Sequence, residues 1–129
     1  GNLEVNSRGE FIRELTFNGK SKKEGIYSPV TQNARHMEMI KLLRLANKRN
    51  PLMRVALEKS FGELHKSVIV LANPKTVINL KRAPKNVKDQ IIRSDQLIEY
   101  IKRLIRENKD LASSEKDMYE MADFFVGFA

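Results

Sequence analysis

The pattern of apolar and polar residues predicts short strands followed by amphipathic helices. Residues 3–6 alternate apolar and polar side chains, and residues 10–17 place most of their large apolar side chains on one face, so both segments are predicted to be strands. The segment Asn6-Ser7-Arg8-Gly9 between them consists of turn-forming residues, so we expect a β-hairpin over residues 1–17. One face of the second strand collects its large apolar residues and an arginine, namely Phe11, Arg13, Leu15 and Phe17.

The next segment, residues 18–24 (NGKSKKE), is predicted to be a polar loop. Its three lysines, Lys20, Lys22 and Lys23, are flexible cations that can contact phosphate, although a loop that only aids solubility fits them equally. The segment lacks the glycine pattern of a phosphate-binding P-loop. The three lysines are therefore expected nucleic-acid contacts and are not part of a nucleotide site.

Residues 28–49 (SPVTQNARHMEMIKLLRLANKR) are predicted to form the central helix of the chain. Ser28 can cap the first turn, and Pro29 suits the first helical position because it has no N–H to leave unpaired. At 100° per residue, one apolar sector collects Met39, Leu42, Leu43 and Ala46, with Ile40 at its edge.

The same helical wheel places Gln32 and His36 inside this apolar sector and Arg35 at its rim. Polar groups on an inward face are commonly core residues whose hydrogen bonds are satisfied by backbone or water. They can equally form one edge of a site with polar groups opposite. The pattern alone leaves both interpretations open.

The second half of the chain is predicted to contain one hairpin and several helices. Pro51 starts a helix to about Lys59, and the apolar run 68–71 and the β-branched run 76–80 are expected to pair as a hairpin over residues 66–80. Residues 84–128 are expected to be helical apart from a loop at 108–113. The residues expected to face inward in the first and last of these helices are Leu52, Val55, Ala56, Met118, Met121, Ala122 and Phe125.

Composition limits the class of protein. A chain of 129 residues without cysteine fits a single domain, 1–129, with no disulfides and no cysteine-based zinc site, and we expect a cytoplasmic protein. The chain does not begin with Met, and we expect it to be part of a longer protein. A net charge of +8 attracts polyanions, but it does not by itself identify a nucleic-acid site.

Three segments, taken in order, resemble a known family. The runs SPVTQNARH, VIVLANPKTVINLKRAP and IIRSDQLIEYIKRL are similar to the C-terminal portion of the NERD (nuclease-related) domain, a relative of the PD-(D/E)XK nucleases. The resemblance implies an α+β fold with a small mixed or antiparallel sheet flanked by helices, as in the C-terminal part of a restriction-endonuclease-like fold. It also implies DNA processing by metal-dependent phosphodiester hydrolysis in the full-length protein.

The resemblance assigns roles to a few residues of this chain. Gln32 and His36 match the family's Q-x-x-x-H motif and would be accessory catalytic residues beside the metal site, and Arg35 would contact the DNA backbone. Asn33 belongs to the matched run, but the wheel turns it away from Gln32. The acidic residues and lysine that hold Mg²⁺ in the family have no match here, so no cofactor is assigned to this chain and it is expected to be inactive alone.

The predicted partner is DNA, and two other functions fit the composition. The chain can be a non-catalytic nucleic-acid-binding module or a protein-interaction module. A homodimer is a further expectation, because strands missing from the family's sheet would leave an edge beside Val68 and Val70 open to a second chain.

Overall fold

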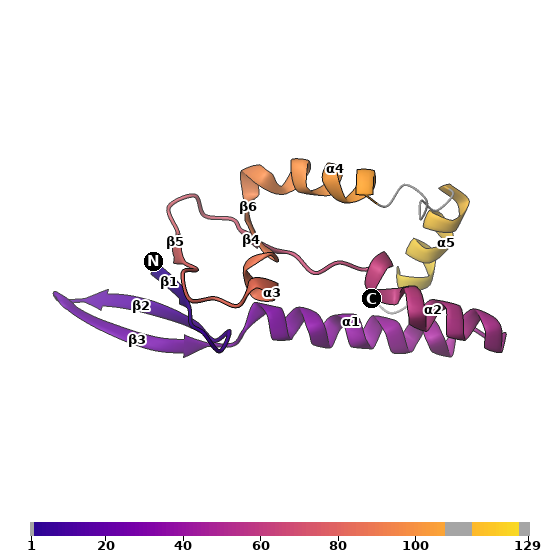
Figure 1. The fold of residues 1–129 in the computed structure, drawn as a ribbon, viewed down its shortest axis with the longest axis horizontal. Coiled ribbons are helices and arrows are strands. Elements are labelled where there is room, and N and C mark those ends of the chain that lie inside the picture. Colours follow the sequence, from indigo (N-terminus) through magenta and orange to yellow (C-terminus); the bar gives the residue numbers. More distant parts are fainter. Residues whose placement is uncertain (1, 108–114, 127–129) are drawn as a thin grey trace. The chain divides into compact units, whose positions relative to one another are not determined.

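The computed structural model describes residues 2–107 and 115–126, the side chains of 115–118, 121 and 125 excepted. The chain consists of two compact units, Gly1–Leu97 and Ile98–Ala129, which are described separately. The first unit contains all the strands found among the described residues (Figure 1). Its elements are β1 (Asn2–Val5), β2 (Phe11–Phe17), β3 (Lys20–Ile26), α1 (Pro29–Ala46), α2 (Pro51–Leu64), β4 (Ile69–Leu71), β5 (Val77–Asn79), α3 (Lys85–Lys88), β6 (Ile91–Arg93) and a 3-10 turn, η1 (Ser94–Gln96). Helices α4 (Leu97–Glu107) and α5 (Glu115–Val126) follow.

The main sheet has four strands in the order β3-β2-β1-β5. The β1–β2 and β2–β3 pairs are antiparallel, whereas β5 pairs with β1 in parallel, so the sheet is mixed. A second sheet consists of β4 and β6 in parallel. The predicted α+β class with a small mixed sheet and helices is therefore confirmed at this level.

The core of the first unit lies where the β1–β2 hairpin meets the segment before β6. Val5 and Phe11 flank the hairpin turn and are buried with Ala83 and Val87. The turn itself is closed by Asn6, whose side-chain oxygen accepts hydrogen bonds from the backbone N–H groups of Arg8 and Glu10. Because only the ends of β2 and β3 nearest this turn reach the core, the rest of both strands extends beyond it (Figure 1).

The prediction of a loop at residues 18–24 is wrong, because most of this segment is strand β3. Asn18 and Gly19 form a two-residue turn, and both have positive φ, 50° and 75°, which is typical of the type I′ turns that join antiparallel strands. The strand is polar because it lies outside the core and needs no apolar alternation. The Asn-Gly pair is the local signal that indicates the hairpin.

The predicted hairpin over residues 66–80 is also wrong. β4 pairs with β6, and β5 pairs with β1. Strands of three residues make few ladder hydrogen bonds, so contacts with distant segments decide their partners and neighbourhood in the sequence does not. β6 lies within the stretch 84–128 that was expected to be helical, and its β-branched Ile91 and Ile92 pair with Ile69 and Val70.

The helices differ from prediction mainly in the faces they bury. α2 continues past Lys59 to Leu64 and buries Leu57 and Phe61, whereas Leu52 and Val55, expected inside, are exposed. Ala56 and Ala122 are exposed as well. The expected inward positions of Met118, Met121 and Phe125, the cap Ser114 and the loop 108–113 lie outside the described residues. None of the helices in the described ranges is long and apolar enough to span a membrane.

The Asn18-Gly19 turn generates the first prediction. Gly19→Ala places a side chain at φ 75°, where an L-residue costs about 1–2 kcal/mol, so the β2–β3 hairpin will open more often. Faster amide hydrogen exchange of residues 20–24 measures this effect. Gly25→Ala is the control, because a Cβ there meets no atom within 4 Å and its φ is not positive. Equal exchange in the two variants would contradict a turn that depends on positive φ.

Candidate nucleic-acid interface

The part of the β2–β3 hairpin beyond the core, residues 13–24, is called the arm. Its register pairs Phe17 with Lys20 and Leu15 with Lys22. Directly opposite residues of antiparallel strands project from the same face, so two lysines flank the two apolar side chains. This face of the arm, called the arm face, carries Arg13, Leu15, Phe17, Lys20, Lys22 and Glu24.

Exposure rises along the arm face with distance from the core. The pair Phe11 and Ile26, next to the core, is buried or partly buried. Arg13 and Glu24 follow and form an ion pair. Beyond them Leu15 is 42% exposed and Phe17 is 77% exposed, and Lys20 and Lys22 are exposed beside them. The outer half of the arm face therefore presents an aromatic ring and two cations to solvent.

The opposite face of the sheet holds Lys23, so the three predicted lysines do not form one cluster. Lys23 Nζ lies 3.6 Å from a carboxylate oxygen of Glu4. Beside this pair, Glu14 accepts a hydrogen bond from the hydroxyl of Ser21. Glu4, Glu14 and Lys23 line a hollow of about 240 Å³ together with Asn2 and Asn79.

The two carboxylates of this hollow already have partners, Glu4 in Lys23 and Glu14 in Ser21. Mg²⁺ is bound through carboxylates and waters in near-ideal octahedral geometry, and a catalytic site places several oxygen ligands together. Across residues 2–107 and the described part of 115–126, no group of three or more His, Cys, Asp or Glu residues can hold a metal ion. The described residues therefore do not fit the Mg²⁺ that the family resemblance implies for the full-length domain.

Most of the predicted apolar sector of α1 faces solvent, although Leu43 is partly buried, and the inward orientation expected for Gln32 and His36 is wrong. Both side chains are exposed, as are Met39 (62%) and Leu42 (59%). Apolar residues occur on more than one side of α1, so periodicity does not decide which side packs. Arg35 is exposed and lies over the ring of Tyr27, with 5.5 Å from its guanidinium carbon to the ring centroid. A role for these three residues in a site stays a prediction.

In contrast to Gln32 and His36, the side chain of Asn33 on α1 points into the structure. Its side-chain nitrogen donates to the hydroxyl of Ser67 at 2.9 Å and to the carbonyl oxygen of Val68 at 3.3 Å. These two hydrogen bonds fix the chain at the entry to β4. The helical wheel correctly places Asn33 and Gln32 on different sides of α1. The structure shows, however, that Asn33 points inward and Gln32 outward.

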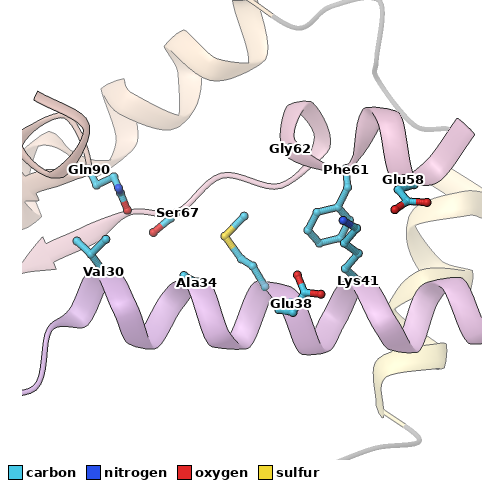
Figure 2. A pocket seen from close by; sticks show the side chains of 10 residues that line it. Val30, Ala34, Glu38, Lys41, Glu58, Phe61, Gly62, Ser67 and Gln90 are labelled. Carbon is cyan, nitrogen blue, oxygen red and sulfur yellow. The ribbon is translucent and has the colours of Figure 1, made fainter. Parts of the chain in front are cut away.

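The packed side of α1 borders a pocket of about 430 Å³ shared with α2 (Figure 2). Its apolar wall includes Val30, Met37 and Phe61, and Glu38, Lys41 and Glu58 lie toward one end. At the other end the side chain of Gln90 donates from its nitrogen to the carbonyl of Asn86, while its oxygen is buried without a hydrogen-bond partner in the described structure.

His65 ends α2 beside this pocket and has a structural role. Its ring stacks on Phe61 with centroids 3.9 Å apart, and Nδ1 lies 3.1 Å from the carbonyl oxygen of Phe61. A carbonyl only accepts, so Nδ1 carries the proton and Nε2 accepts from Arg44 at 3.1 Å. Burial lowers the pKa of His65; the hydrogen bond to the Phe61 carbonyl opposes this effect, and the nearby Arg44 charge adds a smaller lowering.

Residues 81–88 contain a second group of cations, which was not predicted as a site from the sequence. The stretch KRAPKNVK has four cations and no acidic residue, and all four are exposed on either side of the buried Ala83 and Val87: Lys81, Arg82, Lys85 and Lys88. The absence of acidic residues in this stretch was the available signal.

Comparisons of the chain with family models, with curated proteins and with solved structures gave no match. The resemblance to the NERD domain, DNA as a partner and the homodimer therefore stay predictions.

The contrast between Asn33 and Gln32 generates the second prediction. Asn33→Ala removes two partly buried hydrogen bonds and should lower the free energy of unfolding by about 1 kcal/mol. Gln32→Ala, on the adjacent exposed position, should change it by less than about 0.5 kcal/mol. Urea denaturation of both variants makes the comparison. A larger loss for Gln32→Ala would show that the assigned faces of α1 are reversed.

Proposed function

We propose that this chain binds nucleic acid within a nuclease-related protein that processes DNA, and that its own contribution is to contact the phosphate backbone through the arm. The observation that carries the proposal is the pair Lys20 and Lys22. Both are exposed on one face of a projecting hairpin, and within the described part of the chain neither has a carboxylate partner.

The absence of a carboxylate partner distinguishes these two lysines from other cations of the sheet. A lysine that contacts phosphate contributes by releasing a counterion from the nucleic acid. Lys23 and Arg13 are already paired with Glu4 and Glu24, so a phosphate must compete with these carboxylates. The cations at residues 81–88 and the net charge of +8 add to the field that attracts a polyanion.

Hydrolysis of the phosphodiester bond belongs to the proposal only through the family resemblance. The described residues do not fit a divalent metal, so no catalytic step is derived for them. Gln32 and His36 remain the proposed accessory residues, and Arg35, which lies over Tyr27, is a proposed further contact to the backbone.

A second function, a protein-interaction module, is favoured by a different observation. Several large apolar side chains of α1 and α2 are at least half exposed, namely Met39, Leu42, Leu52, Met53 and Val55. Exposed apolar surface of this kind is common at protein contacts. It does not account for the unpaired lysines of the arm, which is why we place nucleic-acid binding first.

Binding of labelled DNA over a range of salt concentrations tests the third prediction. The affinity should fall with salt, and Lys20→Ala with Lys22→Ala should reduce the slope of log affinity against log salt by about 1 to 2. The single variants Lys22→Ala and Lys23→Ala provide a matched control. They remove the same charge from adjacent positions on opposite faces, and Lys22→Ala should reduce the slope more.

No binding at low salt would overturn the proposal and favour the interaction module. Equal effects of Lys22→Ala and Lys23→Ala would show that net charge, and not the arm face, governs binding.

A further inference from the structure

We infer that the side chain of Phe17 is a stacking platform for an unpaired base, so that the arm selects single-stranded nucleic acid over duplex. This inference rests on the proposed function and names the class of substrate that the arm takes.

The position of Phe17 suits a ring that must reach a ligand. It is the last residue of β2, it directly precedes the Asn18-Gly19 turn, and it is 77% exposed. Its cross-strand partner is Lys20, and the neighbouring pair on the same face is Leu15 with Lys22. A base stacked on the ring therefore has cations beside it that can reach its flanking phosphates.

The chemistry of the arm face favours bases that are not already stacked. A two-stranded ribbon can enter the major groove of B-DNA, but it reads base edges there with hydrogen-bonding side chains. Phe17 and Leu15 have no donor or acceptor for a base edge. In a duplex the base faces are covered by their neighbours, whereas a single strand offers them, and stacking on an aromatic ring is worth about 1–3 kcal/mol per base.

The charges around Leu15 and Phe17 favour a nucleic acid over a second protein as the ligand of the arm face. Lys20 and Lys22 border both apolar side chains, and the nearest acidic group of the arm face, Glu24, is paired with Arg13. A second protein surface would need carboxylates at matching positions, while every nucleotide of a single strand provides both a ring and a phosphate. The base matches the apolar side chains of β2 on the arm face, and the phosphate matches the lysines that lie opposite them on β3.

The first test compares a short poly-dT or poly-U strand with a blunt duplex of equal length. Phe17→Ala should weaken single-strand binding about 5- to 150-fold without changing the salt slope, and it should leave duplex binding nearly unchanged. Phe17→Leu keeps apolar bulk without an aromatic face, so it should lose as much single-strand affinity as Phe17→Ala. Because Phe17 is exposed, these variants should keep the wild-type fold, which circular dichroism checks.

The second test gives a direct signal from the ring. The chain has no tryptophan, so Phe17→Trp introduces a single tryptophan at the proposed contact, and its emission can be excited selectively over that of the three tyrosines. Its emission should be quenched by the single strand and not by the duplex, while affinity for the single strand is retained or increased.

The outcomes separate this inference from the proposed function. If Phe17→Ala leaves single-strand affinity unchanged while Lys20→Ala with Lys22→Ala reduces the salt slope, phosphate contact stands and stacking is wrong. If neither change affects binding, both are wrong. If Phe17→Ala instead converts a dimer to a monomer in sedimentation without weakening single-strand binding, a second copy covers the ring and the inference is overturned.

Discussion

The register of the β2–β3 hairpin is the constraint on which the proposed interface depends. Asn18 and Gly19 fix this register through a two-residue turn, and the pairing of Phe17 with Lys20 follows directly. Side chains alternate between the two faces of a sheet, so a shift of one residue along β3 would exchange Lys22 with Lys23 on the arm face. Ser21 would then lie opposite Phe17, and Lys23, which is otherwise paired with Glu4, would lie opposite Leu15.

One end of this sheet packs in the core and stabilises the fold, while its other end, the arm, is exposed and carries the proposed interface. The ends of β1 and β2 near their turn bury Val5 and Phe11, and they anchor the hairpin in the core. Past the Arg13–Glu24 ion pair, the strands no longer bury side chains and are free to present them. On α1, Asn33 and Arg44 make the polar contacts that hold the chain, whereas Gln32 and His36 are left at the surface.

Local signals predicted those elements that local interactions determine. The first hairpin follows from Asn6 and Gly9, and the start of α1 follows from Ser28, whose hydroxyl accepts from the N–H of Thr31. The β2–β3 hairpin was not predicted because β3 is rich in lysine. An exposed strand needs no apolar residues, so its sequence resembles that of a loop. The three-residue strands escaped because distant partners determine their pairing. The arm face could have been predicted from Asn18-Gly19, since the turn alone sets which residues lie opposite each other.

The inward face of α1 could not be predicted from the sequence alone. Met39 and Leu42 are as apolar as Met37 and Ile40, and the helix gives no local preference between the two sides. The choice is made by the segments that pack against it, including Ser67 and Val68, which accept hydrogen bonds from Asn33. A helical wheel shows which residues share a face, but it does not show whether that face is buried. Gln32 and His36 were therefore placed inside although they are exposed.

Amide chemical-shift mapping by NMR during titration with a short poly-dT strand tests the central claim most directly. The account predicts that the largest shifts fall on the arm, from Leu15 to Lys22. Large shifts at Gln32 and His36 with an unchanged arm would contradict it.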